Sequence, residues 1–113
     1  MHELSITQGL LEIVLEEATK HSISKVRLVK LRIGELTAVQ PSSLTFCFEL
    51  LTKDTLAEGA DLEIDLVPIK RKCLSCREFF ETDDASFVCP ACASFNTELI
   101  SGRELYVEQI EGD

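Results

Sequence analysis

Apolar positions recur with a helical period in two segments of the chain. Between residues 4 and 20 they are spaced by three or four residues, which predicts a helix with a broad buried face. This face is formed by Ile6, Leu10, Leu11, Ile13, Val14, Leu15 and Ala18. Ser5 and Gln8 have the spacing of a capping box, which would leave residues 1–4 outside the first regular turn. A second helix is predicted from Pro41, a residue suited to a first helical turn. Its apolar stripe consists of Leu44, Cys47, Phe48 and Leu51.

Alternation of apolar and charged residues predicts strands in two segments. The first runs from about residue 25 to residue 33 and is ended by Gly34. The second spans residues 62–66 and stops at Pro68, which cannot donate a hydrogen bond to a ladder. A third strand is predicted over residues 104–110, which are rich in residues that favour strands.

Between Pro68 and Gly102 the apolar periodicity weakens and two cysteine pairs appear, which indicates an inserted module. The predicted fold class is therefore α+β: two helices packed on a small three-stranded mixed sheet, with an inserted zinc-ribbon-like Cys₄ module. Residues 1–68 together with 102–113 are expected to form the α+β domain, and residues 69–101 the module.

Composition and charge narrow the possible functions. The chain has 113 residues, 45% of them hydrophobic and 27% charged, which fits one domain carrying one small module. A formal net charge of -9 repels phosphate backbones and argues against nucleic acid as a partner. No apolar run approaches the roughly 18 residues that span a bilayer, and no basic stretch precedes one at the amino end. The expected location is therefore the cytoplasm, without membrane association.

The most specific motif is a pair of Cys-x-x-Cys knuckles, formed by Cys73 with Cys76 and by Cys89 with Cys92. Two residues between thiolates let one turn direct both sulfurs at a common point, and two such turns complete the tetrahedron that zinc prefers. Because cysteine fills all four positions, the site is predicted to be structural and not catalytic. Two disulfides or a redox pair remain as the alternative.

Three further features of the sequence receive structural interpretations. The Lys-Arg-Lys run at residues 70–72 is predicted to be a solvated hinge and not a nucleic-acid contact. Cys47, on the apolar face of the second helix, is expected to be a small buried hydrophobe and not a fifth ligand. The module's own apolar contacts are expected from Phe79, Phe80 and Phe87.

The amino terminus offers a second candidate metal site. The Met1 amine, the His2 amide and the His2 imidazole can close successive chelate rings around a square-planar nickel ion, and the Glu3 amide could complete the square. Because histidine is large, the initiator methionine should be retained and His2 should stay second. His21, at the predicted end of the first helix, is expected to interact with the terminal carbonyls and the helix dipole.

With both features present, the sequence resembles the HypA/HybF family of nickel-insertion proteins for hydrogenase maturation. The resemblance covers essentially the whole chain. In order along the sequence it rests on the opening Met-His-Glu-Leu-Ser, Ile33-Gly34, Ser43-Leu44-x-Phe46-x-Phe48, Ala57-Glu58-Gly59 and both knuckles.

The resemblance implies a non-enzymatic metallochaperone. Its nickel would be bound by His2 with the backbone neighbours Met1 and Glu3, and its structural zinc by Cys73, Cys76, Cys89 and Cys92. It also implies delivery of nickel to the large-subunit precursor of nickel-iron hydrogenase, in cooperation with a HypB-type GTPase.

Several alternatives stay open at this point. A zinc-ribbon module for nucleic-acid or protein interaction is the main rival function, and a redox enzyme using one Cys-x-x-Cys pair is another. A nitrogen-rich terminal site intrinsically favours copper over nickel, so partner delivery would have to provide selectivity. The sequence leaves open a monomer or a homodimer, the hydrogenase served, and any role in urease maturation.

Overall fold

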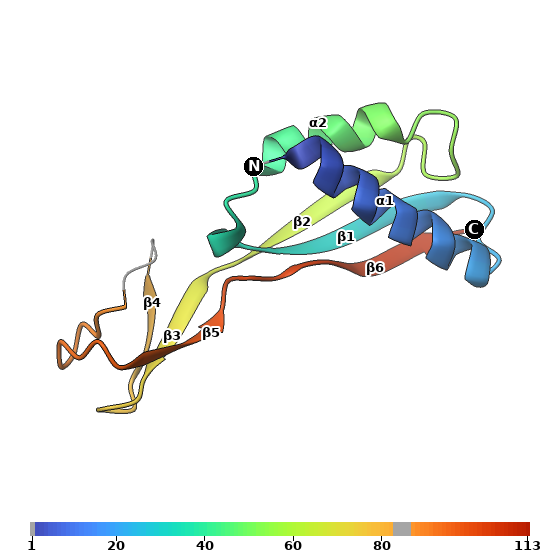
Figure 1. The fold of residues 1–113 in the computed structure, drawn as a ribbon. Coiled ribbons are helices and arrows are strands. Elements are labelled where there is room, and N and C mark those ends of the chain that lie inside the picture. Colours follow the sequence, from blue (N-terminus) through green and yellow to red (C-terminus); the bar gives the residue numbers. More distant parts are fainter. Residues whose placement is uncertain (1, 83–86) are drawn as a thin grey trace. The chain divides into compact units, whose positions relative to one another are not determined.

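A computed structural model describes residues 2–82 and 87–113 of the chain (Figure 1). The elements in order are α1 (Glu3–Lys20), β1 (Val26–Gly34), the 3₁₀ helix η1 (Glu35–Thr37), α2 (Pro41–Leu51), β2 (Asp61–Val67), β3 (Ile69–Cys73), β4 (Phe79–Thr82), β5 (Thr97–Ser101) and β6 (Leu105–Gly112). They confirm the predicted α+β class, and all five predicted helices and strands are present with bounds shifted by a few residues.

The chain divides into two compact units. We call the first the helix-and-sheet unit; it comprises Met1–Arg32, Val39–Asp65 and Tyr106–Asp113. The second, the cysteine unit, comprises Ile33–Ala38 and Leu66–Leu105. The assignment of residues 1–68 with 102–113 and of residues 69–101 to separate functional domains stays a prediction. No helix in the described part of the chain has the length and apolar character needed to cross a lipid bilayer.

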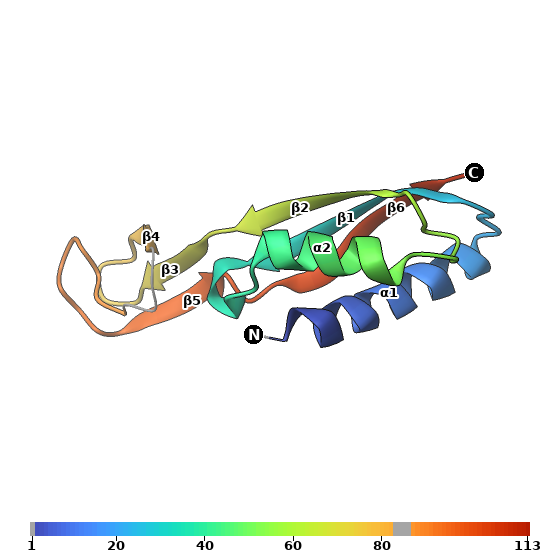
Figure 2. The same ribbon diagram turned by 90° about the horizontal axis from the view of Figure 1, so that it is seen from above.

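A mixed sheet with strand order β2-β1-β6 forms the base of the helix-and-sheet unit. The ion pairs Lys30–Glu63 and Arg32–Asp65 advance together along β1 and β2, as parallel strands require. Strand β6 runs the opposite way (Figure 2), and the Asp113 N–H donates to the Lys25 carbonyl at the start of β1. Both helices lie on the same face of these strands, α1 on the β6 side, and they pack against each other.

Burial on the central strand explains why this sheet is stable. The apolar side chains of β1 are buried at four positions, Val26, Val29, Leu31 and Ile33. The helices contribute buried side chains over the sheet at Leu10, Leu11, Val14, Ala18, Leu44 and Phe48. Each large apolar side chain removed from water contributes about 1.5 to 3 kcal/mol, so this layer is the main source of folding energy in the unit.

Helix α1 begins earlier than the capping-box spacing predicted. His2 is the N-cap residue, its carbonyl accepts the Ile6 N–H at 3.1 Å, and no side chain caps the helix. The expectation that residues 1–4 lie outside the first turn is therefore wrong. The buried stripe also includes Thr7, whereas Ile13 is 47% exposed because it borders a groove between α1 and β6.

Helix α2 starts at Pro41 as predicted. Leu44 and Phe48 are its buried residues, but Cys47 is only half-buried, so the expectation of a fully buried thiol is wrong. Cys47 lies beside these two residues, at the border of the buried stripe. Thr52 after the helix is buried and donates its hydroxyl hydrogen to the Phe48 carbonyl at 2.8 Å.

The cysteine unit contains a second sheet, with strand order β4-β3-β5 and β3 antiparallel to both neighbours. The Lys-Arg-Lys run lies inside β3, so the predicted solvated hinge is wrong. Alternation along the strand places Arg71 on the opposite face from Lys70 and Lys72. A run of three basic residues therefore forms a paired central strand.

The basic side chains of β3 contact aromatic rings. Arg71 is 7% exposed, its guanidinium lies 4.7 Å from the centre of the Phe87 ring, and its Nε donates to the Thr97 hydroxyl at 3.1 Å. The Lys70 and Lys72 ammonium groups lie 5.4 and 5.5 Å from the Phe79 ring. Phe79 and Phe87 are both 54% exposed, so cation–π contacts replace much of the apolar packing expected of them.

Two glycines provide a test of the packing. A Cβ at Gly34 would overlap the backbone of Gly102, so we expect Gly34→Ala to reduce the free energy of unfolding by about 2 to 3 kcal/mol. At Gly9, in α1, a Cβ would meet no described atom within 4 Å. Gly9→Ala should therefore raise the free energy of unfolding by about 0.5 to 1 kcal/mol, because alanine favours the helix more than glycine does. Urea unfolding at fixed zinc concentration measures both changes; equal effects would contradict the close approach of Gly34 and Gly102.

Candidate metal centre

The four cysteines of the two knuckles converge on one point in the cysteine unit. Their Sγ atoms all lie within 4.8 Å of one another. The Cys73 and Cys92 sulfurs are 3.5 Å apart, and the Cys76 and Cys89 sulfurs are 3.7 Å apart. A zinc ion bound to four sulfurs at about 2.3 Å requires sulfur–sulfur separations of about 3.8 Å. The donor set and its spacing therefore fit a closed tetrahedral zinc site.

The first knuckle is shaped by two backbone hydrogen bonds at the end of β3. The Arg77 N–H donates to the Cys73 carbonyl at 2.8 Å, and the Cys73 N–H donates to the Glu78 carbonyl at 2.8 Å. The Cys76 N–H also points at the Cys73 sulfur, at 3.4 Å. These bonds turn the chain back tightly enough to bring both sulfurs of the knuckle to one side.

The second knuckle repeats this arrangement at equivalent positions. The Ala93 N–H donates to the Cys89 carbonyl at 2.8 Å, and the Cys89 N–H donates to the Ser94 carbonyl at 2.9 Å. The hydroxyls of Ser75 and Ser94 lie 2.9 Å apart and link the two turns. The pair of knuckles is thus one structure formed twice, with a direct polar contact between the copies.

Each knuckle places a residue other than glycine in the left-handed region. Arg77 has φ of 66° and Ala93 has φ of 60°. This conformation costs an L-residue about 1 to 2 kcal/mol. The knuckles therefore carry backbone strain that the surrounding bonds, or a bound metal, must offset.

The sulfurs differ in burial and in acidity. Cys73 and Cys89 are buried, whereas Cys76 and Cys92 are exposed. The Cys76 backbone N–H is the main reason that the pKa of Cys73 falls to about 6. The Glu78 backbone N–H lowers the pKa of Cys76, but desolvation and the neighbouring thiols outweigh it and raise that pKa to about 12. A divalent cation would therefore have to displace protons from the remaining thiols as it binds.

The cysteine unit has little apolar core. Among its described residues, the buried apolar side chains other than cysteine are Ile33, Val67 and Ile69. Small domains with such cores usually depend on metals or disulfides for stability. The cysteine cluster is therefore placed where a metal would contribute most to folding.

The second candidate site, at the amino terminus, belongs to the helix-and-sheet unit. His2 is exposed at the start of α1, and Met1 lies outside the described residues. The Glu3 carboxylate accepts the Gln40 backbone N–H at 3.2 Å, which is the main reason that the pKa of Glu3 is lowered. No local pattern in the sequence indicated Gln40, because this contact joins residues far apart along the chain.

His21 lies at the other end of the same helix. Its Nε2 is 3.5 Å from a Glu17 carboxylate oxygen, while its backbone N–H donates to the Glu17 carbonyl. The 18 residues of α1 span about 27 Å, so His2 and His21 cannot bind one metal ion together.

Comparison with known proteins gives consistent matches along the chain. The model of the HypA family, described as "Hydrogenase/urease nickel incorporation, metallochaperone", matches residues 1–112. The hydrogenase maturation factor HypA of Caldanaerobacter subterraneus subsp. tengcongensis is 43% identical over 112 residues, covering 98% of each chain. That of Dehalococcoides mccartyi is 42% identical over 116 residues, covering 100% of this chain and 95% of the relative.

Solved structures agree with these sequence matches. The solution structure of the Ni metallochaperone HypA from Helicobacter pylori is 28% identical and has a TM-score of 0.69, covering 99% of this chain and 97% of that one. A second solution structure of a HypA protein, also 28% identical, has a TM-score of 0.71 and covers 99% and 96% of the two chains.

The left-handed residues of the knuckles lead to a prediction about stability. Ala93→Gly should relieve backbone strain and stabilise the cysteine unit by about 0.5 to 1 kcal/mol, after allowing for the flexibility of glycine in the unfolded chain. Zinc retention in a chelator titration should then improve roughly twofold to fivefold. Ala91→Gly is the matched control, because Ala91 lies in the same knuckle and does not have a positive φ. Improvement in both variants would show that flexibility, and not relief of strain, was responsible.

Proposed function

The chain belongs to the HypA family, and from this premise we propose that it is a nickel metallochaperone without enzymatic activity. It binds Ni(II) at its amino terminus and delivers the ion to the large-subunit precursor of nickel-iron hydrogenase during maturation. The observation that carries the proposal is the family match over residues 1–112, which includes the terminal Met-His-Glu and both cysteine knuckles.

The chemistry of the amino terminus supports the proposed nickel site. The Met1 amine, the backbone nitrogens of His2 and Glu3 and the His2 imidazole provide the nitrogen donors that square-planar nickel prefers. Helix α1 begins at Glu3, and the first N–H groups of a helix have no partner within the helix. The Glu3 carboxylate already contacts Gln40, so Glu3 would contribute its backbone nitrogen. Because the His2 side chain is exposed, nickel can enter and leave without unfolding the domain.

The role proposed for the four cysteines is structural. Cys73, Cys76, Cys89 and Cys92 would fill all positions of a zinc tetrahedron, leaving no position for water or substrate. Zinc would ionise the thiols and tie the end of β3 to the second knuckle. It would stabilise the cysteine unit, whereas nickel is a cargo that the terminal site holds temporarily.

The main alternative is a zinc-ribbon module for nucleic-acid or protein interaction. The formal net charge of -9 opposes nucleic-acid binding, and the side chains of the basic run at residues 70–72 already contact other side chains of the cysteine unit. Arg71 is buried against Phe87 and Thr97, and the two lysines lie against Phe79. A redox role for one cysteine pair is opposed by the convergence of all four sulfurs.

The proposed partners follow from the family. They are a HypB-type GTPase and the hydrogenase large-subunit precursor, with neither nucleic acid nor membrane involved. The protein would act in the cytoplasm as a monomer or homodimer.

We expect the purified protein to contain about one zinc ion per chain, bound by four thiolates. Cys73→Ser should abolish zinc retention and disorder the cysteine unit, because a tetrahedral site loses a buried ligand. Elemental analysis and the dispersion of backbone amide NMR signals measure the two effects. Cys47→Ser is the matched control, since Cys47 lies in α2 and should not affect zinc. A metal-free, reduced protein whose cysteine unit still gives dispersed signals would contradict the structural role.

We expect His2→Ala to abolish high-affinity nickel binding without changing zinc content or unfolding either unit, because the side chain is exposed. A short tag ahead of Met1 should weaken nickel binding as severely, since it converts the terminal amine into an amide. Acidification should release nickel, because protons compete for an imidazole and an amine with reference pKa values of about 6.5 and 7.7 to 8.0.

His21→Ala is the histidine control and should leave nickel affinity unchanged, because His21 lies at the far end of α1. Calorimetric nickel titrations of the native, tagged, His2→Ala and His21→Ala proteins give the comparison. Equal affinity in the native, tagged and His2→Ala proteins would exclude the terminal site.

A further inference from the structure

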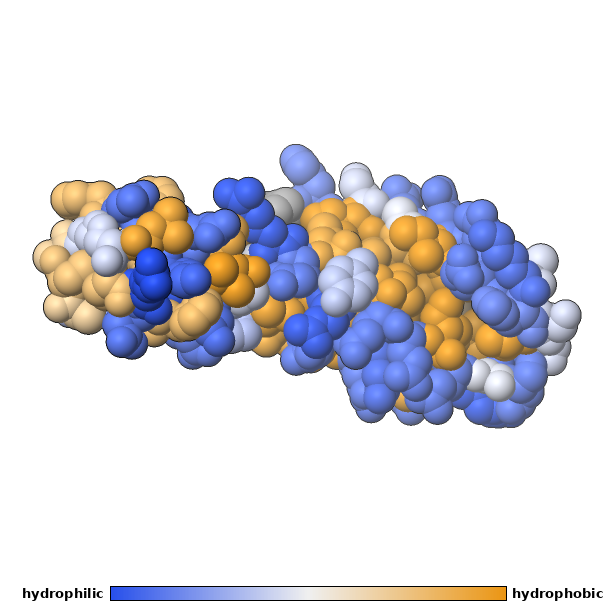
Figure 3. All heavy atoms as spheres, turned by 90° about the horizontal axis from the view of Figure 1, so that it is seen from below, coloured by the Kyte–Doolittle hydropathy of each residue, from blue (hydrophilic) through white to orange (hydrophobic). Residues whose placement is uncertain are grey.

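A groove of about 540 Å³ lies between α1 and β6 in the helix-and-sheet unit. Its apolar lining comes from Ile13 on α1, Ile23 just after the helix, and Val107 and Ile110 on β6. Ile13 is 47% exposed although it lies on the apolar side of the helix. Figure 3 shows apolar side chains gathered on the face of the molecule seen from below, with hydrophilic side chains along their borders. The exposure of Ile13 shows that the groove has apolar surface that the fold itself does not cover.

One side of this groove is an edge strand. In the described sheet, β6 has β1 on one side and no strand on the other. An edge strand presents unpaired backbone N–H and C=O groups that can pair with an additional strand. An extended peptide seated here would gain main-chain hydrogen bonds from β6 and apolar contacts from Ile13.

Charge determines which kind of strand fits. Strand β6 contains Glu108 and Glu111 and has no lysine or arginine. On α1, Glu17 lines the groove. Its carboxylate oxygens lie 3.5 Å from the Lys20 ammonium and 3.5 Å from the His21 Nε2, and His21 lines one end of the groove. A second copy of β6 would bring two more glutamates and no basic side chain to this edge, and like charges on paired strands destabilise the pairing. A segment carrying lysine or arginine would instead be attracted.

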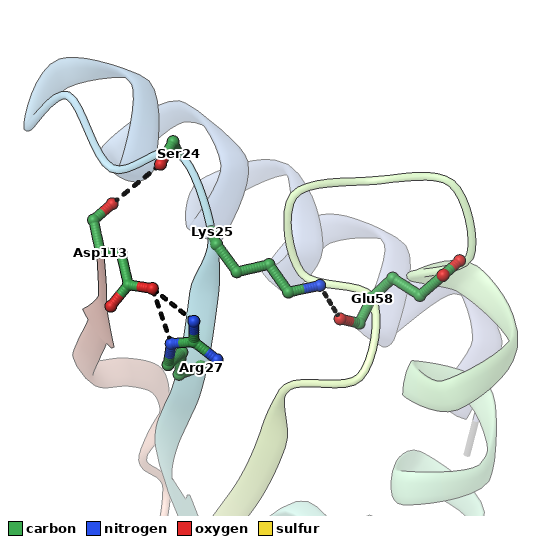
Figure 4. Close-up of polar contacts among 5 residues, drawn as sticks. All are labelled: Ser24, Lys25, Arg27, Glu58 and Asp113. Carbon is green, nitrogen blue, oxygen red and sulfur yellow. Dashed lines mark hydrogen bonds and ion pairs between the residues drawn. The ribbon is translucent and has the colours of Figure 1, made fainter.

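The carboxyl end of the edge strand is tied to the neighbouring segment of the chain. Figure 4 shows Asp113 fixed by two residues of the neighbouring segment: its carbonyl accepts the Ser24 hydroxyl, and its carboxylate accepts the Arg27 guanidinium, whose Nε is 2.8 Å away. Arg27 lowers the pKa of the Asp113 carboxyl, so this attachment persists at neutral pH. A strand held in place in advance loses little entropy when another strand pairs with it.

We propose that the groove and the outer edge of β6 form a docking site for a basic, extended segment of a partner protein, which adds to the sheet beside β6. Alternate apolar side chains of the segment cover Ile13 and Val107, and its lysine or arginine side chains, on the opposite face, approach Glu108. Nickel takes no part in this contact. The site is therefore independent of the proposed metal chemistry.

The test uses the full-length, zinc-containing protein and a synthetic peptide that alternates lysine with valine. Addition of the peptide should shift the backbone amide signals of β6 in an NMR titration, and binding should weaken as salt is added. A peptide with glutamate in place of lysine should not bind. Ile13→Ser should weaken binding by about tenfold through lost apolar contact. Leu50→Ser should have no effect, because Leu50 is also 47% exposed but lies on α2.

Glu108→Lys gives a second variant that does not depend on apolar contact. It should weaken binding of the lysine peptide and strengthen binding of the glutamate peptide. Glu49→Lys, on α2, should change the affinity for neither peptide. The proposal is wrong if the lysine peptide does not shift the backbone amide signals of β6, or if the lysine and glutamate peptides bind with equal affinity. It is wrong as well if Leu50→Ser weakens peptide binding as much as Ile13→Ser does. It is also wrong if sedimentation shows a dimer that Ile13→Ser dissociates, because a second copy would then occupy the groove.

Discussion

Four sulfur atoms within 4.8 Å of one another set the constraint on which the cysteine unit depends. The Glu78 backbone N–H lowers the pKa of Cys76, but desolvation and the neighbouring thiols outweigh it and raise that pKa to about 12. Ionising all four thiols at this separation adds mutual repulsion. A central divalent cation removes it. With three buried apolar side chains besides cysteine among the described residues, the unit has little else to hold β3 against the second knuckle. Metal binding at this cluster would therefore be coupled directly to folding of the unit.

The sequence predicted the elements whose side chains follow a regular period. Helices α1 and α2 and strands β1, β2 and β6 each bury one face against the same core, so their apolar spacing carries the information. Strands β3, β4 and β5 lack that signal. Lys70 and Lys72 lie against an aromatic ring instead of a core, and Arg71 is buried by Phe87 and Thr97, which come much later in the chain. A local pattern cannot distinguish such a strand from a polar connection.

The candidate sites also differ in whether local sequence or tertiary structure determines them. Spacing alone identified the four cysteines, because a knuckle is a local turn whose geometry depends on adjacent residues. The contact between Glu3 and Gln40 depends on tertiary structure, and no local pattern predicts it. The exposure of Ile13 likewise follows from the position of α1 beside an edge strand, although the helical period placed Ile13 on the buried face.

The edge position of β6 also has a spectroscopic consequence. The chain has no tryptophan and a single tyrosine, Tyr106, which lies in β6 and is 46% exposed. Intrinsic fluorescence excited at wavelengths that tyrosine absorbs and phenylalanine does not therefore originates from this strand alone. The unlabelled protein carries its own optical probe of the sheet edge, and that probe is separated in sequence from both the cysteines and the amino terminus.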